Sequence, residues 1–168
     1  MVWIKVAFVL VVLMVWQANA LTMKNCDRRL PVQITSVNFK PDPIIVRKGR
    51  KVTFSGTLKS YRTVGSTYTL KLKVVKKGWI DVGVPCMGSF GSCEYKGLKC
   101  EQMLPYLNVP KCPPPSGSYT LKERTMVIPS VNLPSFLTSG KYYMKAEVFD
   151  EANRRRIGCV EVNFQAKS

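Results

Sequence analysis

The most reactive side chains in this chain are six cysteines, and four of them (Cys86, Cys93, Cys100 and Cys112) fall within the stretch from Trp79 to Cys112. Thiolates bind zinc, but the spacing of these four contains no C-x-x-C knuckle, so a zinc site is disfavoured. The chain has no histidine, which excludes a Ser-His-Asp or Cys-His hydrolase and removes the commonest general base. We therefore expect neither a metal site nor an enzyme.

The first twenty residues predict a signal peptide. Lys5 is followed by an apolar run from Val6 to Trp16, and the segment closes on the small-x-small pattern of residues 18–20. A membrane span needs ~20 apolar residues, so an uncleaved anchor is the weaker alternative. We expect a signal peptide over residues 1–20 and one domain over residues 21–168, either secreted or in the lysosomal lumen. An even number of cysteines in that compartment predicts three disulfides, and six cysteines allow about 15 sets of pairs.

The charge is strongly basic, with 26 Lys and Arg against 10 Asp and Glu. A net charge of +16 either serves solubility or indicates an anionic partner, which could be nucleic acid or a membrane surface. The secretory signal argues against nucleic acid. Most basic residues are also scattered singly between apolar ones, as Lys71 and Lys73 are. An anionic membrane surface is therefore the expected partner.

Alternating apolar and polar residues predict β-strands on both sides of the cysteine-rich stretch. The clearest pattern places Val52, Phe54, Gly56 and Leu58 on one face, and similar patterns cover residues 32–39, 68–74, 80–84, 118–128, 142–149 and 160–164. Turn signals separate these segments, and no long helical period occurs. The predicted fold is an all-β antiparallel β-sandwich or β-cup.

The stretch from Trp79 to Cys112 lacks a comparable pattern over most of its length. A loop this long is either functional or disordered, and cysteine cross-links argue against disorder. We predict a disulfide-stapled lid on the β-domain, with a short helical segment after Cys100 limited by Pro105.

Apolar residues also occupy predicted connections, where strand pairing does not require them. Val131, Leu133, Phe136 and Leu137 lie in the turn-like connection that begins at Pro129 and contains Pro134, and Trp79 follows a Lys-Lys-Gly turn. Such residues suit a membrane interface, although they could equally cap the core. Whether Phe54, Leu70, Leu72 and Met144 pack against one another or surround a cavity is likewise open.

Six landmarks in order and at matching spacing resemble the GM2-ganglioside activator family of the ML (MD-2-related lipid-recognition) domain. They are Asn25-Cys26-Asp27, residues 41–46, Trp79-Ile80 leading to Val84-Pro85-Cys86, Gly91-Ser92-Cys93, residues 134–142, and Arg156-Ile157-Gly158-Cys159. Together they extend over essentially all of residues 21–168.

The resemblance implies a β-cup with an internal apolar cavity for lipid acyl chains. It implies the disulfides Cys26–Cys159, Cys86–Cys93 and Cys100–Cys112, without the fourth disulfide of the family activator. The residues expected to line the lipid cavity are Phe54, Leu70, Leu72, Val74, Ile80, Leu104, Leu107, Leu133, Tyr142, Met144 and Val148. Those expected to contact the membrane are Lys76, Lys77, Trp79, Phe136 and Leu137. Lys76 and Lys77 stand where the family has apolar residues, and Phe136 stands in place of a tryptophan.

The implied function is lipid binding and transfer. The protein would extract a ganglioside-like glycolipid or a phospholipid from a membrane and present it to a hydrolase, for example a glycosidase such as a β-hexosaminidase, with no cofactor. The alternative is a secreted lipid-recognition protein with an immune, chemosensory or venom role and no hydrolase partner.

Overall fold

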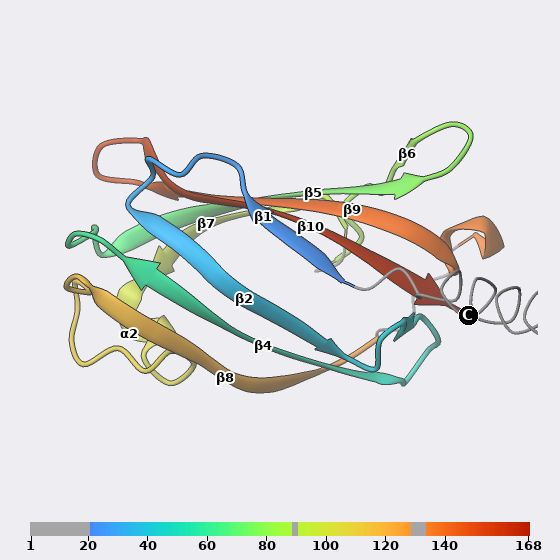
Figure 1. The fold of residues 1–168 in the computed structure, drawn as a ribbon, viewed down its shortest axis with the longest axis horizontal. Coiled ribbons are helices and arrows are strands. Elements are labelled where there is room, and N and C mark those ends of the chain that lie inside the picture. Colours follow the sequence, from blue (N-terminus) through green and yellow to red (C-terminus); the bar gives the residue numbers. More distant parts are fainter. Residues whose placement is uncertain (1–20, 89–90, 129–133) are drawn as a thin grey trace, which may run out of the picture.

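The computed structural model describes residues 21–88, 91–128 and 134–168 and shows two layers of β-strands (Figure 1). One layer contains β2 (Val32–Lys40), β4 (Lys51–Ser60) and β8 (Gly117–Val127). The other contains β5 (Thr67–Lys77), β9 (Gly140–Asp150) and β10 (Arg155–Lys167), with β1 (Thr22–Asn25), β6 (Val82–Gly83) and β7 (Glu94–Lys99) beside them. The short elements are β3 (Ile44–Ile45), the helix α2 (Cys100–Met103) and the 3-10 turn η1 (Ser135–Leu137). The predicted signal peptide lies outside the described residues.

The two layers are joined along one side. The strand order is β6-β5-β9-β10-β2-β4-β8, so β10 and β2 connect the layers while β6 and β8 lie at the ends of the order. The join is narrow, with one recorded parallel residue pair between Gly158 and Val32. The layers are therefore free to diverge toward β8, which is the geometry of a cup.

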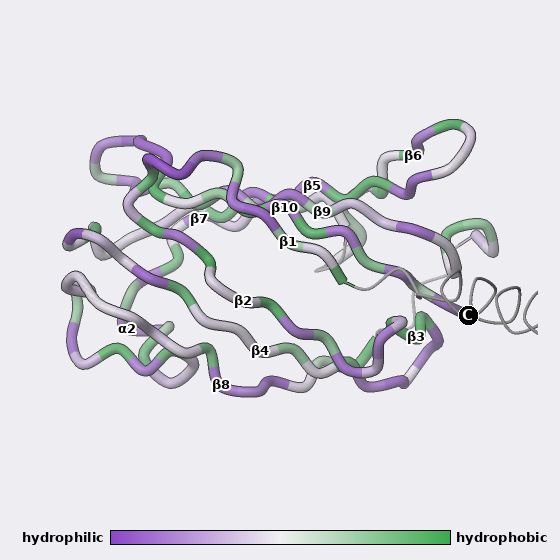
Figure 2. Tube along the Cα trace, in the orientation of Figure 1, coloured by the Kyte–Doolittle hydropathy of each residue, from purple (hydrophilic) through white to green (hydrophobic). Residues whose placement is uncertain are grey.

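The all-β cup predicted from the sequence is confirmed, with one difference in strand direction. The main pairs, β2–β4, β4–β8, β5–β9 and β9–β10, are antiparallel as expected. The last strand, β10, also runs parallel to β2 and to β3. Figure 2 shows hydrophobic and hydrophilic segments following one another at short intervals along β2 and β10, as expected for strands with one inward face.

The cysteine-rich stretch is more regular than predicted. Residues 94–99, which were not predicted as a strand, form β7 and pair with β5. Val82–Gly83 forms β6, which lies within the strand predicted over residues 80–84 and also pairs with β5. Gly97 takes a φ of +66°, which favours glycine, and its N–H donates to the Glu151 carboxylate over 2.7 Å. Residues 100–112 remain as an irregular segment that includes α2, and we call this part the lid segment.

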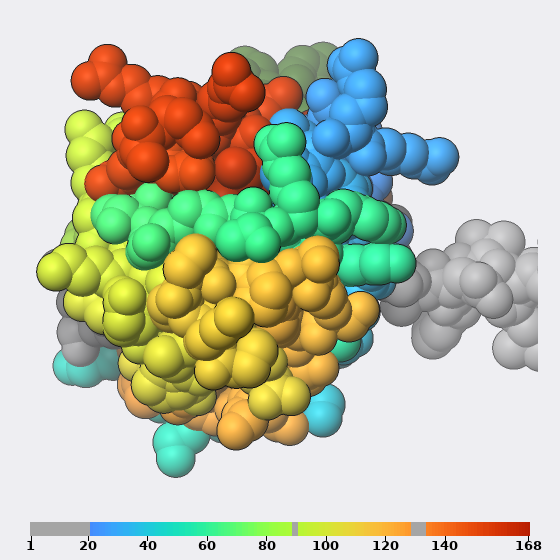
Figure 3. All heavy atoms as spheres, turned by 90° about the vertical axis from the view of Figure 1, so that its left-hand side faces the viewer, coloured from blue at the N-terminus to red at the C-terminus, as the bar shows by residue number. Residues whose placement is uncertain are grey.

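The lid segment closes one end of the cup. Figure 3 looks onto that end, where the chain around residues 100–118, coloured yellow to gold, covers the lower part of the face. The backbone N–H of Asn108 donates to the Thr120 carbonyl over 3.2 Å, and that of Lys122 donates to the Tyr106 carbonyl over 3.1 Å. These bonds fix the lid segment along β8.

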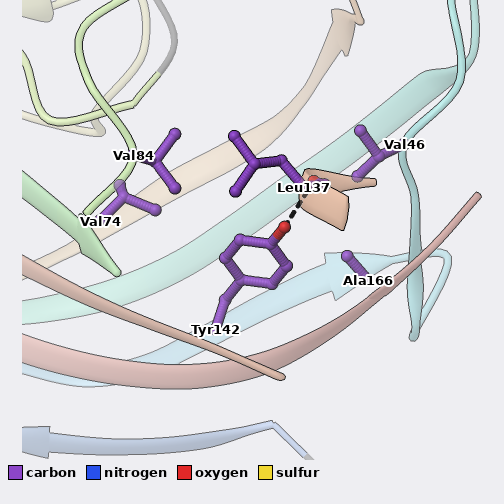
Figure 4. Packing of buried hydrophobic residues seen from close by; sticks show 6 residues of the cluster. All are labelled: Val46, Val74, Val84, Leu137, Tyr142 and Ala166. Carbon is purple, nitrogen blue, oxygen red and sulfur yellow. Dashed lines mark hydrogen bonds between the residues drawn. The ribbon is translucent and has the colours of Figure 1, made fainter. Parts of the chain in front are cut away.

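Two groups of buried residues fill the two ends of the cup. Near α2, Tyr68, Cys100 and Ile157 pack together with Val148 beside them. At the other end the cluster contains Val46, Val74, Val84, Leu137, Tyr142 and Ala166 (Figure 4). The middle of the cup lies between these clusters.

No helix within the described residues is long and apolar enough to span a bilayer.

Candidate functional site

A cavity of about 830 Å³ lies in the middle of the cup, between the two layers. β2, β4 and β8 form one wall, and the opposite wall includes Leu70 of β5, Met144 of β9 and Val160 of β10. Met103, Tyr106 and Leu107 of the lid segment also line it. Small-molecule sites typically measure roughly 300–1,000 Å³, so this cavity has the capacity of a ligand site.

The strand registers explain why the cavity lies in the middle. On β5, Tyr68 belongs to the cluster near α2 and Val74 to the opposite cluster, while Leu70 between them faces the cavity. On β10, Val160 occupies the same intermediate position between Ile157 and Phe164. The inward side chains meet at the ends of the cup and are held apart in between.

Four of the residues predicted for the lipid cavity line this space: Phe54, Leu70, Leu107 and Met144. The role of these residues in lipid binding stays a prediction.

The other residues predicted for the cavity lie elsewhere. Val74 and Tyr142 are buried in one end cluster, and Val148 packs against the other. Ile80 is 76% exposed in the connection after β5. Leu72 and Leu104 are half-buried and do not line the cavity. Leu133 lies outside the described residues.

Most of the wall was not predicted. The larger residues that sequence reasoning missed are Ile34, Val37, Phe39, Leu58, Met103, Tyr106, Leu121, Arg124, Met126 and Val160. Several small polar residues also line the cavity. Alternation on β2, β4 and β10 was a usable signal for the apolar ones. Two of the small polar residues satisfy each other in the apolar wall, because the hydroxyls of Ser36 and Thr57 lie 2.8 Å apart and bond each other.

The opening of the cavity is marked by side chains that line it and are also exposed. Tyr106 and Met126 are such residues, at 46% and 41% exposure. Arg124 precedes Met126 by two positions on β8, so both side chains belong to the same face. We call Tyr106, Arg124 and Met126 the rim.

Arg124 is the charged member of the rim. Its Nη2 donates a hydrogen bond to the Pro105 carbonyl over 3.0 Å, and its guanidinium carbon lies 4.2 Å from the centre of the Tyr106 ring. The Nε atom is buried and has no hydrogen-bond partner among the described residues. The arrangement joins β8 to the lid segment but leaves this donor unsatisfied.

A second notable surface lies at the end of the molecule opposite α2, where the connection after β5 and η1 both project (Figure 1). Trp79 is fully exposed there, Ile80 lies next to it, and Phe136 is 53% exposed. We call these three residues the aromatic end. Lys76, near the end of β5, donates a hydrogen bond to the Phe136 carbonyl, which ties η1 to β5.

Lys77, which was expected to contact membrane, is paired within its own turn. Its ammonium group bonds the carboxylate of Asp81. That hydrogen bond is the main reason why the pKa of Asp81 is lowered, so the carboxylate stays charged and offsets Lys77.

Leu137 differs from the expectation that it contacts the membrane. It is only 7% exposed, and its side chain points into the buried cluster with Val74, Val84 and Tyr142 (Figure 4). The Tyr142 hydroxyl donates to the Leu137 carbonyl, which holds η1 against the cluster. The short turn of η1 places consecutive side chains in different directions, so Phe136 is exposed while Leu137 is buried.

Three disulfides join the cysteines in the pairs that the resemblance implies. They are Cys26–Cys159, Cys86–Cys93 and Cys100–Cys112. The first ties the chain after β1 to β10, the second closes the loop between β6 and β7, and the third staples the lid segment. The described residues contain no cluster of side chains suited to hold a metal ion.

Comparison with known proteins agrees with this architecture. The family model described as ML domain matches residues 20–166. The ganglioside GM2 activator of Mus musculus is 27% identical over 166 residues, covering 90% of this chain and 84% of the mouse protein. The ganglioside GM2 activator of Macaca fascicularis is 28% identical over 158 residues, covering 85% of this chain and 81% of the macaque protein.

Among solved structures, a Niemann-Pick type C2 protein from Japanese carpenter ant aligns with a TM-score of 0.50 and 13% identity. The alignment covers 87% of this chain and 99% of the ant protein, and at this identity the similarity concerns the fold. The family model extends over nearly the whole sequence, from residue 20 to residue 166. This chain therefore belongs to the ML domain family.

Proposed function

We propose that this protein binds lipids and transfers them, with acyl chains held in the cavity between the two layers. The observation that carries the proposal is the cavity itself, a space of about 830 Å³ whose walls are formed mainly by apolar side chains such as Phe54, Leu70 and Met144. A filled β-sandwich would have no such space, because protein interiors are normally close-packed.

The energetics of extraction suit a reversible carrier. Each methylene group that leaves a bilayer for an apolar cavity keeps about 0.8 kcal/mol of burial that it would lose in water. The free energy of an acyl chain is then nearly the same in the membrane and in the cavity, so the transfer is reversible.

The aromatic end supplies a means of reaching the membrane. Trp79, Ile80 and Phe136 are exposed apolar side chains at one end of the molecule. Aromatic rings favour the headgroup region of a bilayer, and each basic residue near an anionic surface adds about 1 kcal/mol of attraction. With a net charge of +16 in the full sequence, the protein would bind anionic membranes in preference to neutral ones.

The relatives named ganglioside GM2 activator support a finer proposal about the ligand and the partner. The lipid would be a ganglioside-like glycolipid or a phospholipid. Its headgroup would be presented to a lysosomal or extracellular hydrolase, for example a glycosidase such as a β-hexosaminidase. In this role the protein is not an enzyme, and the predicted signal peptide would deliver it to the compartment where the hydrolase acts.

A transfer assay tests the proposal. Fluorescent glycolipid in donor vesicles containing anionic lipid is mixed with acceptor vesicles and purified protein, and transfer is followed at low and high salt. We expect transfer that needs the protein and weakens with salt. Native mass spectrometry should find lipid bound one to one.

The partner is tested separately, by adding a β-hexosaminidase and measuring glycolipid hydrolysis. Transfer without stimulated hydrolysis would contradict the activator role and favour a lipid-recognition protein without a hydrolase. Absence of both bound lipid and transfer would contradict the whole proposal.

A further inference from the structure

The rim of the cavity contains a cation that the apolar character of the site does not require. Arg124 lines the cavity from β8, between the exposed side chains Tyr106 and Met126. Seven ion pairs occur among the described residues, and none of them includes Arg124. The positive charge therefore remains uncompensated at the opening.

The hydrogen bonds of the guanidinium group are incomplete. An arginine carries five N–H donors. Among the described residues, Nη2 bonds the Pro105 carbonyl and Nε bonds nothing, although Nε is shielded from water. Nε is therefore closed to a ligand as well, but Nη1 is not among the buried atoms and makes no hydrogen bond to the described residues, so it is the donor that an acceptor atom of a ligand could meet.

The contact with Tyr106 leaves the guanidinium available to such a ligand. The guanidinium carbon lies over the Tyr106 ring, 4.2 Å from its centre, in a cation–π contact that does not neutralise the positive charge. The N–H groups point outward in the plane, where they match the oxygens of a carboxylate or a phosphate. An amphiphile with its chain in the cavity would bring its polar group to the rim.

We propose that Arg124 binds the negatively charged oxygens of an amphiphile whose acyl chain occupies the cavity, so that the protein selects anionic over neutral lipids. The inference rests on the proposed function and adds the class of headgroup. The shared chemistry is an oxyanion close to the chain, which is a carboxylate in a fatty acid and a phosphodiester in a phospholipid.

A competing role for Arg124 is mechanical, because it also joins β8 to the lid segment. If it only held Pro105 and Tyr106 in place, its loss would loosen the cavity for every occupant. Binding of neutral and anionic amphiphiles would then fall together. An oxyanion site instead predicts a loss confined to the anionic ligands.

The test measures how well matched ligands displace an uncharged fluorescent probe, N-phenyl-1-naphthylamine, from the purified protein. One pair is palmitate and its methyl ester, and the other is phosphatidylglycerol and phosphatidylcholine with the same acyl chains. The variant is Arg124→Gln. The control is Lys122→Gln, which removes the same charge from an exposed residue of β8 that does not line the cavity.

We expect Arg124→Gln to weaken binding of an anionic ligand about tenfold or more, since hydrogen bonds to charged groups are worth about 1.5–3 kcal/mol. The methyl ester and phosphatidylcholine should change by no more than about twofold, as should every ligand with Lys122→Gln, because an exposed charge contributes little. Arg124→Lys should keep part of the anionic preference. Loss for palmitate alone identifies the carboxylate as the ligand group, and loss for phosphatidylglycerol alone identifies the phosphodiester.

Equal weakening of neutral and anionic ligands by Arg124→Gln, or no weakening at all, would overturn the inference. Thermal melting of each variant shows whether it is folded. If the parent protein binds none of the ligands, the proposed function fails as well, whereas binding without preference for anions overturns this inference alone.

Discussion

Lys76 and Phe136 connect two segments that are 60 residues apart in the sequence. The ammonium group of Lys76, on β5, donates to the main-chain carbonyl of Phe136 in η1. The same nitrogen lies 5.9 Å from the centroid of the Phe136 ring, within range of a cation–π contact. The end of β5, three residues before Trp79, is thereby bonded to η1.

Lys76→Met should weaken vesicle binding even when the vesicles carry no charge, because it removes the hydrogen bond and the cation–π contact that orient Phe136. The control is Lys77→Met, which removes the same charge but breaks only the local bond to Asp81. On anionic vesicles both variants should bind less well, since both lower the positive charge of this end. Cosedimentation with neutral and anionic vesicles measures the difference, and equal behaviour of the two variants on neutral vesicles would show that the link is unimportant.

Trp79→Ala and Phe136→Ala should change folding stability little, while lipid transfer falls strongly. Both side chains are exposed, so their truncation leaves no cavity. Leu137→Ala is the matched control, because Leu137 is buried and such truncations cost about 2–5 kcal/mol. Urea denaturation measures stability beside the transfer rate, and large destabilisation by the first two variants would show that their rings support the core.

Trp79 also provides a direct signal, since it is the sole tryptophan of residues 21–168. We expect its fluorescence to shift to shorter wavelength on binding to vesicles and to be quenched by brominated lipids.

The sequence was sufficient to predict those strands whose apolar and polar residues alternate regularly. The alternation from Val52 to Leu58 specifies a strand with an inward face, and β4 covers Lys51–Ser60. β7 was missed because Glu94–Lys99 is charged and contains Gly97, whose positive φ interrupts the regular strand. β1 was not predicted either, because Thr22–Asn25 is short and is fixed by pairing with β10.

The candidate site was harder to predict because its position depends on the divergence of the two layers. Leu70 and Val74 share a strand face and similar chemistry, yet one lines the cavity and the other is buried in a cluster. That difference comes from what stands opposite each residue, which alternation does not encode. Arg124 was missed for the same reason, since a charged residue in a strand normally predicts a solvent-exposed position.

Leu70→Trp should reduce the number and length of acyl chains that the protein holds, because the larger side chain enters an existing space. Stability should change little. Val74→Trp is the comparison on the same strand, where overpacking of a filled cluster costs about 1–3 kcal/mol. Native mass spectrometry measures the lipid bound by each variant, and thermal melts measure its stability. If Leu70→Trp were destabilised as much as Val74→Trp, the cavity would not accommodate a larger side chain.

Folding stability should be nearly constant from neutral pH to about pH 5 and should fall in stronger acid. No histidine titrates in that interval. Burial acts to raise the pKa of Glu147, but hydrogen bonds from Arg156 and Lys145 outweigh it, so the pKa is lowered from 4.5. A carboxyl group whose pKa is lowered by folding stabilises the folded state when the pH is above the pKa of the unfolded chain. That contribution is lost as the pH falls through the pKa of the folded state.

Urea denaturation at a series of pH values measures this dependence. Glu147→Gln should flatten the decline below pH 4.5, the ordinary pKa of this group. A sharp loss of stability between neutral pH and about pH 5 would contradict the prediction, because the ordinary pKa values of carboxyl groups lie below that interval.

Removal of the Cys100–Cys112 disulfide should loosen the lid segment without unfolding the cup. The two cysteines are 12 residues apart, and loop-closure entropy gives a loss of about 3 kcal/mol for the paired change to alanine. The lid segment supplies Met103, Tyr106 and Leu107 to the cavity, so bound lipid should dissociate faster.

The matched control is the paired change of Cys26 and Cys159, which are 133 residues apart and outside the cavity wall. That change should lower stability more, by about 5 kcal/mol, yet alter lipid dissociation less. Urea denaturation and stopped-flow release of a fluorescent lipid test both effects, and faster release from the control than from the lid variant would contradict a gating role for residues 100–112.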